Sequence, residues 1–234
     1  MPSISKITET IINRSPFLRE SLSENLINVS ALARKIKPEI EDKMENPVNE
    51  GAVVMSIKRM SPSYYQGINN EIKKFMGSVG DFLVRSDLED FTYENSSSLI
   101  AKQAELMNTL SKDLDPFYTF CRGVNESTII ISSSLHNKIK TIFSGERLVS
   151  HSKDLASITV KLPKINVEVS GVYYYFLKQL AWEGINIVEV ISTTNEFTAV
   201  VKSDDIDNVF SVFMQLKKEG KTYLNGLGDF AIED

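Results

Sequence analysis

Residues 155–216, LASITVKLPKINVEVSGVYYYFLKQLAWEGINIVEVISTTNEFTAVVKSDDIDNVFSVFMQL, decide the fold, because strand-like and helical runs alternate here with a turn signal at nearly every junction. In Ala156–Leu162 polar and apolar side chains alternate, which predicts a half-buried strand that Pro163 ends. Val172–Glu183 carries apolar residues at helical spacing on two stripes, so most of this helix is expected to be covered. Gly184 follows, where a helix end favours a residue that tolerates positive φ.

A hairpin and a second helix come next in the sequence. Asn186–Thr193 is rich in β-branched residues and predicts a strand, Thr194-Asn195 predicts a tight turn, and Phe197–Val201 is expected to pair back. Asp204 is expected to cap a last helix. The core face of this helix, read from its helical spacing, is Ile206, Val209, Phe210, Phe213 and Leu216.

The order of these elements is β-α-β-β-α, and a closing strand would complete a ferredoxin-like unit. The nearby candidates for that strand, Thr222–Leu224 and Asp229–Ile232, are both weak.

One part of this stretch carries a resemblance to a known family. Residues 170–193, SGVYYYFLKQLAWEGINIVEVIST, closely resemble the ACT domain of the type found in the regulatory half of aspartokinases. The matching features are a Ser-Gly-Val helix start, a helix ending in Glu-Gly, then Ile-Asn-Ile, and a strand ending in Ser-Thr. The sequence departs from the family at Ser170, where proline is common, and Pro163–Ser170 lengthens the usual strand-to-helix turn. The resemblance implies tandem ACT units.

The middle of the chain repeats the order of elements, although the residue identities repeat poorly. A strand is expected at Phe82–Arg85 or Asp90–Glu94, and the further elements, in order, are a helix at Leu99–Leu110, strands at Phe117–Arg122 and Thr128–Ser132, a helix at Leu135–Phe143 and a strand at Arg147–Ser150. We interpret residues 81–153 as a first, degenerate ACT-like unit and residues 154–234 as the second.

Residues 1–78 are predicted to form a helical module. Ile4, Ile7, Ile11 and Ile12 share one helical face, Pro16 suits the first turn of a second helix, and Pro38 is expected to bend or restart a third. Gly67–Gly80 is expected to contain the linker, with a short helix around Ile72, Phe75 and Met76.

The helical module has two interpretations. Its order of helix, helix, turn and helix resembles the winged-helix-like modules that precede ACT-like domains in some small prokaryotic proteins, which would make Ala52–Met60 a recognition helix with Lys58 and Arg59 on DNA. Residues 1–60 hold nine Lys or Arg and eight Asp or Glu, whereas DNA-binding proteins usually show a basic stripe. The alternative is a small helical bundle that packs on the rest of the chain or mediates oligomerisation.

Composition excludes several classes of protein. The net charge of −5 over 234 residues gives no global signature of polyanion binding. The single cysteine, Cys121, excludes an internal disulfide framework and is expected to be a packed side chain. No apolar run approaches the roughly 20 residues of a membrane span, and the N-terminus lacks the apolar core of a signal peptide. A cytoplasmic protein without a cofactor is expected.

The ACT resemblance implies a binding site for a small effector, commonly an amino acid, at an interface between units. It points to Val169, Ser170, Gly171 and Val172 in the loop before the helix, and to Asn186, Ile187, Ser192 and Thr193 beyond it. Physical arguments agree, since N–H groups at a helix start favour an anion, Gly171 leaves their approach open, and Asn186 offers a donor and an acceptor. The alternatives are plain turn geometry for Gly171, an Asn186 that caps its own backbone, and ordinary strand ends for Ser192 and Thr193.

The sequence argues against catalysis. It holds no glycine-rich phosphate loop and no Lys-Phe-Gly-Gly strand of an aspartokinase catalytic domain. His136 and His151, without an adjacent nucleophile or carboxylate pair, are expected to be solvated or helix-capping. Glu39, Glu41 and Asp42 are expected to form a solvated helix face rather than a metal site.

The sequence therefore predicts an α+β protein: a helical, helix-turn-helix-like module followed by two ferredoxin-like βαββαβ ACT units. The expected function is that of a non-enzymatic regulatory protein, a homodimer or higher oligomer, that binds an amino acid at an ACT interface. The alternatives are a DNA-binding transcriptional regulator and an oligomerisation module that binds no ligand.

Overall fold

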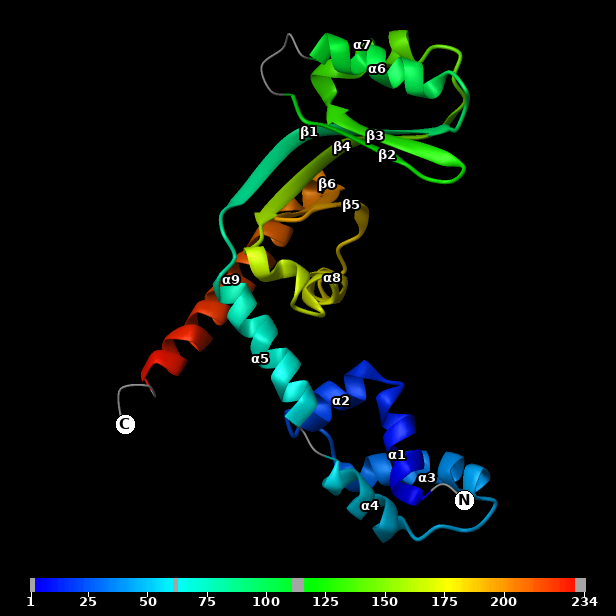
Figure 1. The fold of residues 1–234 in the computed structure, drawn as a ribbon, viewed down its shortest axis with the longest axis vertical. Helices are drawn as coiled ribbons and strands as arrows, with labels where there is room; N and C mark the ends of the chain where they lie inside the picture. The colour runs from blue at the N-terminus through cyan, green and yellow to red at the C-terminus, as the bar shows by residue number, and fades with distance from the viewer. Residues whose placement is uncertain (1–2, 61–62, 111–115, 230–234) are drawn as a thin grey trace. The chain divides into compact units, whose positions relative to one another are not determined.

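The computed structural model describes residues 3–60, 63–110 and 116–229, and the chain divides into two compact units, Met1–Ile72 and Lys73–Asp234 (Figure 1). The boundary falls within α5 (Ser63–Gly77). This helix occupies most of the segment expected to be a linker, because Ile72, Phe75 and Met76 are buried and give it an apolar face to cover.

Unit 1 holds α1 (Ile4–Asn13), α2 (Pro16–Ser23), α3 (Val29–Met44) and α4 (Glu50–Arg59). Each begins at a Ser or Asn whose side chain accepts a hydrogen bond from the first turn, as N-caps do. Their shared core is Ile7, Ile11, Ile12, Leu32, Ala33, Ile36, Ile40, Val48, Val53 and Ile57. The helices expected in this region are therefore confirmed.

Two details of unit 1 differ from expectation. Pro38 does not restart the helix, because α3 continues through it to Met44. Ile36 and Ile40 on either side of the proline are both buried in the same core. Where the structure describes this unit it contains helices only, without the strand pair that a wing requires. Helix-turn-helix function for unit 1 stays a prediction.

Where the structure describes unit 2, it is built on an antiparallel sheet of six strands. The strands are β1 (Phe82–Glu94), β2 (Tyr118–Arg122), β3 (Glu126–Ser132), β4 (Leu148–Lys161), β5 (Ile187–Thr193) and β6 (Glu196–Lys202), in the spatial order β2-β3-β1-β4-β6-β5. The helices are α6 (Leu99–Leu110), α7 (His136–Ile142), α8 (Val172–Trp182) and α9 (Ile206–Asp229), with short 3-10 turns η1 (Ser133–Leu135), η2 (Lys164–Val167) and η3 (Ser203–Asp205). The α+β class is confirmed.

The long strands β1 and β4 each serve two repeats of the fold. The second half of β1 pairs with β3 and with the start of β4, as in Phe91↔His151, whereas its first half pairs with the end of β4, as in Val84↔Ile158. We call Leu88–Ser152 the first repeat, and Leu155–Asp229 together with Phe82–Arg85 the second repeat. Figure 1 shows α6 and α7 at one end of these two strands and α8 and α9 at the other.

The closing strand of the second repeat is therefore Phe82–Arg85, which precedes the first repeat in the sequence. The expected closing strand at Thr222–Leu224 is wrong, because these residues continue α9, as does Asp229. The remainder of the other candidate, residues 230–232, lies outside the described residues.

Each long strand is interrupted where it passes from one repeat to the other. Asp87 and Asp154 have φ values of 55° and 54°, and the pairing register of β1 and β4 shifts between Arg85 and Leu88. Such a bulge lets a strand bend without ending. What the sequence presents as two pairs of short strands is thus one pair of long ones.

The second repeat has an aromatic core beneath α8 and α9. Phe176 of α8 stacks on Phe197 of β6 with ring centroids 5.1 Å apart, and Phe213 of α9 lies 5.0 Å from Phe176. The predicted stripe Val172, Phe176 and Leu180 is buried, as are Val209, Phe213 and Leu216 of α9. Phe210, expected in that core, is 40% exposed. The packing of these buried faces holds the N-terminal end of α8 in place, and it thereby positions the predicted ligand loop that precedes this helix.

Three further side chains are more exposed than residues packed in a core. Cys121 is exposed on the edge strand β2, so the expectation of a packed thiol is wrong. Tyr173 and Tyr174 of α8 are 38% and 44% exposed. No helix within the described ranges is both long and apolar enough to cross a bilayer.

Candidate functional site

The predicted ligand loop lies between η2 and the start of α8. Gly171 is the residue before the helix and has φ +87°, a left-handed conformation that glycine adopts without strain. Val172 is buried, while Ser170 is exposed and Val169 is partly exposed. No side chain in the described chain caps α8 at Gly171. The N–H groups of its first turn, which carry the positive end of the helix dipole, therefore remain for another acceptor.

A hydrogen-bonded group of three side chains joins this loop to the strand that returns beside it. The hydroxyls of Tyr173 and Ser192 lie 2.6 Å apart. The amide of Asn166 donates to the Tyr173 hydroxyl at 3.3 Å and to the Thr194 carbonyl at 3.4 Å. The structure thereby brings Ser192 and Thr193 to the end of α8 where Gly171 lies. Sequence analysis missed Asn166 and the Tyr173 hydroxyl, because the partners are on separate elements.

Asn186 and Ile187 lie at the opposite end of α8. This helix has 11 residues, and at 1.5 Å per residue it is about 16 Å long. Asn186 is exposed and Ile187 is partly exposed at the start of β5. Within one chain, then, the eight predicted residues form two separate groups.

Beside the equivalent helix start in the first repeat, side chains of the chain hold one of its own carboxylates. Glu146 accepts hydrogen bonds from the hydroxyls of Ser96 and Ser98, each at 2.6 Å, and its side chain is only 4% exposed. Lys102 lies 3.3 Å from the same carboxylate, and Ser96 also accepts from the backbone N–H of Leu99. These hydrogen bonds, from Ser96 and Ser98 first, hold the pKa of Glu146 below its usual range.

The two helix starts are comparable because both loops are tied to a hairpin in the same way. The N–H of Asn95 donates to the Asn125 carbonyl at 2.8 Å, and that of Leu162 donates to the Asn195 carbonyl at 2.7 Å. One helix start thus has an internal carboxylate beside it, whereas among the described residues no side chain caps the other. Glu146 carries no sequence signal for this role, since it lies 50 residues from Ser96.

The two histidines are not solvated or capping, and the expectation for them is wrong. Nδ1 of His136 and Nε2 of His151 each lie 2.7 Å from the same oxygen, Oε2 of Glu89. Burial raises the pKa of Glu89, but the hydrogen bonds and charges of the two imidazoles outweigh it and leave the pKa lowered. The carboxylate is therefore the acceptor and both imidazoles donate to it. Sequence reasoning missed the cluster because its members are 47 and 62 residues from Glu89.

The residues predicted to contact DNA are exposed at the end of a helix. Lys58 and Arg59 form the last turn of α4. A recognition helix reads bases chiefly with its N-terminal residues, so this placement does not by itself favour base readout. DNA binding by these residues stays a prediction.

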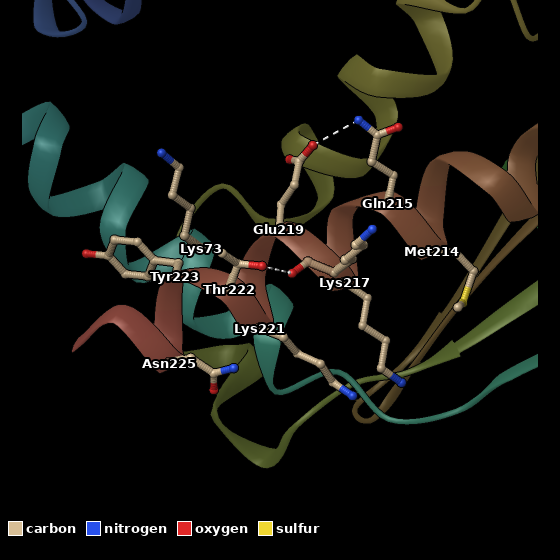
Figure 2. A pocket seen from close by; sticks show the side chains of 10 residues that line it. Lys73, Met214, Gln215, Lys217, Glu219, Lys221, Thr222, Tyr223 and Asn225 are labelled. Carbon is tan, nitrogen blue, oxygen red and sulfur yellow. Dashed lines mark hydrogen bonds between the residues drawn. The ribbon is translucent and has the colours of Figure 1, made fainter. Parts of the chain in front are cut away.

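A lysine-lined groove runs along α9 (Figure 2). Its lysines are Lys73, Lys217, Lys218 and Lys221. The ammonium of Lys217 donates to the Gly80 carbonyl at 2.6 Å and lies 5.1 Å from the centre of the Phe82 ring, so it fastens the start of β1. We interpret the groove as a largely solvated basic face of the helix.

Comparisons with known proteins bear on the fold. No protein-family model and no curated protein matches the chain. Among solved structures, aspartate kinase of Clostridium acetobutylicum matches 60% of this chain with 12% identity and a TM-score of 0.51. The matched region spans 34% of that kinase chain.

Two further matches have lower TM-scores. The regulatory subunit of aspartate kinase from Thermus thermophilus matches 59% of this chain and 99% of its own, at 10% identity and a TM-score of 0.46. Aspartate kinase from Synechocystis matches 61% of this chain and 27% of its own, at 14% identity and a TM-score of 0.47. The fold assignment rests on the Clostridium structure, which supports the ACT-type fold and, at this identity, shows the fold alone.

Proposed function

We propose that the chain is a regulatory protein that binds a small carboxylate effector, an amino acid, at the start of α8. The observation that carries this proposal is the contrast between the two helix starts. Glu146 fills the one at α6 with a buried carboxylate held by two serine hydroxyls and Lys102. The start of α8 is preceded by Gly171, and glycine has no side chain. Among the described residues, no side chain caps this helix. An effector carboxylate would take there the position that Glu146 takes in the first repeat.

Tyr173 and Ser192 would recognise the rest of the effector. Their hydroxyls already bond each other at 2.6 Å beside the loop, and each retains capacity for a further hydrogen bond. Val169, Ser170, Val172 and Thr193 would form the walls of this site.

Asn186 and Ile187 would come from a second copy of the chain. Because α8 separates them from Gly171 by about 16 Å, one chain cannot offer both groups to one small molecule. The strand they begin, β5, lies at the edge of the sheet, where unpaired backbone groups suit side-by-side association of two sheets. The proposed protein is therefore a homodimer whose effector stabilises one arrangement of the two copies.

The proposed role is regulatory rather than catalytic. The chain matches about a third of an aspartate kinase that is described as an allosteric enzyme. The sequence lacks the phosphate-binding motifs sought above. We propose that any catalytic activity under its control lies outside these 234 residues.

A thermal-shift screen against all proteinogenic amino acids tests the proposal. A ligand that binds only the folded state raises the melting temperature, and at 100 times its Kd the stabilisation is about 2.7 kcal/mol. We expect one or two amino acids to produce a shift that Tyr173→Phe and Ser192→Ala reduce. Ser150→Ala, at an exposed strand serine of the first repeat, is the matched control and should keep the full shift.

One further variant separates the parts of the proposal. Asn186→Ala should weaken the same ligand only if the site is shared between copies, and the loss should then depend on protein concentration. A screen without any shift, or a shift that survives both Tyr173→Phe and Ser192→Ala, would remove the proposed site.

A further inference from the structure

The chain has two histidines among 234 residues, and both lie in one cluster on the first repeat. His136 is the first residue of α7, His151 is in β4, and Glu89 is in β1 between them. Their ligand atoms, one from each side chain, all lie within 4.8 Å of one another. Three elements that are distant in sequence thus direct their donor atoms toward one point.

The surroundings hold these side chains in place while leaving an opening to solvent. The ring of His151 stacks on Phe91 with centroids 4.0 Å apart and planes 16° from parallel. The Glu89 side chain is 8% exposed, whereas those of His136 and His151 are 19% and 18% exposed. The carboxylate is therefore fixed and dry, and the imidazole edges remain reachable by a small ion and by water.

The second repeat shows that the fold does not require polar groups at these positions. Asp87 of β1 and Asp154 of β4 share the left-handed conformation and are equivalent positions of the two repeats. Glu89 follows Asp87 by two residues, and Ala156 follows Asp154 by two residues, so Ala156 is at the position of Glu89. The 3-10 turns η1 and η3 precede α7 and α9 in the same way, which places Ile206 at the position of His136.

The residue equivalent to His151 follows from strand pairing. His151 of β4 pairs with Phe91 of β1. The equivalent of Phe91 in the second repeat is Ile158, which pairs with Val84, so Val84 is at the position of His151. The second repeat thus has alanine, isoleucine and valine where the first has glutamate and two histidines. A purely architectural role would be served by the apolar set, because burying a charged group without functional need costs stability.

We propose that Glu89, His136 and His151 bind a divalent first-row transition-metal ion, for which Zn²⁺ is the best match. Zinc takes imidazole nitrogen at about 2.0–2.1 Å and carboxylate oxygen at about 2.0–2.2 Å, and two histidines with one glutamate form one of its known three-residue sets. Two nitrogen ligands disfavour Mg²⁺ and Ca²⁺, which prefer oxygen. Water would fill the remaining coordination position from the exposed side.

Binding would require a small rearrangement and a change in protonation. Ligand atoms on a tetrahedral ion lie about 3.3–3.5 Å apart, so the two 2.7 Å contacts to Glu89 would open slightly. Each imidazole would present a lone pair at Nδ1 of His136 or Nε2 of His151. The proton now at that nitrogen would move to the other ring nitrogen or be released to solvent. The bound ion would then join β1, α7 and β4.

Metal analysis of tag-free, full-length protein tests the site. The protein is stripped with EDTA, incubated with Zn²⁺ or Co²⁺, dialysed and measured for metal content and melting temperature. We expect about one ion per chain and a raised melting temperature. Glu89→Gln, which keeps the shape but removes the charge, should weaken binding at least about 10-fold.

A neighbouring residue supplies the matched control. Asp90→Asn changes another buried carboxyl group of the same strand, on the opposite face of the sheet. Its charge acts on His151 only at a distance, so this variant should weaken metal binding far less than Glu89→Gln. Equal metal content in the wild type and in Glu89→Gln would overturn the proposal, as would no retained metal in the wild type. The result in both cases is independent of any amino-acid effector.

A measurement on the wild type keeps the test decisive if Glu89→Gln does not fold. Co²⁺ is paramagnetic, so a histidine ligand shifts its ring N–H proton far outside the normal proton spectrum. We expect two such exchangeable signals, because two histidines bind the ion. A Co²⁺-loaded protein without shifted imidazole signals would show that the ion lies elsewhere and would overturn the proposal.

Discussion

Glu146 shows how one side chain can anchor the start of a helix from a distant part of the chain. It follows α7 in sequence, yet its carboxylate accepts from Ser96 and Ser98 at the start of α6. Lys102, one turn into α6, interacts with the same carboxylate and donates to the Ser144 carbonyl. The loop after α7 and the start of α6 are thereby held together by charge-assisted hydrogen bonds, which are the stronger kind.

We expect Glu146→Gln to destabilise the protein by about 1–3 kcal/mol at neutral pH, because the hydroxyls of Ser96 and Ser98 and the ammonium of Lys102 lose a charged acceptor. The hydrogen bonds from Ser96 and Ser98 lower the pKa of Glu146 in the folded state. Its contribution is therefore complete above the unfolded pKa, about 4.3, and is lost as pH falls through the lower folded pKa. Urea unfolding of both proteins between neutral and acidic pH should show the difference in free energy shrinking below that range. A constant difference would contradict the assignment.

Asp87 and Asp154 are the residues at which the long strands pass between repeats. Both have the left-handed conformation, which costs L-residues about 1–2 kcal/mol and which Asp and Asn tolerate best after glycine. We expect Asp154→Val to destabilise by about that amount and Asp154→Gly to be near neutral. Urea midpoints with unchanged m-values would measure both. Equal effects of valine and glycine would show that the backbone conformation is not what matters at this position.

The crossing of α5 and α9 depends on two glycines, one in each helix. A Cβ atom built on Gly77 would lie 2.6 Å from the Gly220 carbonyl oxygen, and one built on Gly220 would lie 2.7 Å from the Met76 carbonyl carbon. These neighbours are backbone atoms, which cannot rotate away. The two helices can therefore approach this closely only because neither has a side chain at the crossing.

We expect Gly220→Ala to destabilise unit 2 by about 1–3 kcal/mol, as overpacking does. Gly226→Ala, in the same helix, is the matched control, because nothing lies within 4 Å of a Cβ atom there. Removing that helical glycine should instead stabilise by about 0.5–1 kcal/mol. Thermal unfolding monitored by circular dichroism distinguishes the two. Similar effects from both variants would mean that the close approach is not a constraint.

Individual elements could be predicted where local signals are complete. The helix predicted at Val172–Glu183 and the hairpin β5–β6 follow from apolar spacing, a helix-ending Gly184 and a turn at Thr194-Asn195. Both are confirmed, with the helix observed at Val172–Trp182. The long strands could not be predicted as such. Asp87 and Asp154 are turn-favouring residues, so each break in the alternation reads as the end of a strand when it is only a bulge.

The candidate sites were predictable only in part, because contacts between distant residues leave no local signal. The loop at Gly171 and the strand end at Ser192 could be named from the ACT resemblance, and the structure places them near each other. The distance between Asn186 and Gly171 could not be predicted from the sequence, because it depends on the length and direction of α8. The cluster at Glu89 has no motif, because its ligands come from three elements.

At the scale of the whole molecule, β1 and β4 make the two repeats interdependent. Each strand contributes one half to each repeat. A fragment of residues 73–153 would lack the end of β4, and a fragment of residues 154–234 would lack β1 altogether. Each fragment would expose the edge where its missing strand belongs.

We therefore expect neither fragment to fold alone, whereas an equimolar mixture should recover structure because each fragment supplies the other's missing strand. Dispersion of amide signals in proton–nitrogen correlation spectra of the separate and mixed fragments measures this. The intact protein should lose both repeats in one thermal transition. A cooperative transition in either isolated fragment would show that the shared strands are dispensable.

The arrangement also constrains how such a chain can change over generations. Two self-sufficient copies of a repeat can be separated by a break in their gene and diverge on their own. Here such a break would leave both products incomplete, since the strand that closes the second repeat is encoded ahead of the first. The two halves must be inherited together, and each substitution in a shared strand is tested in both halves at once.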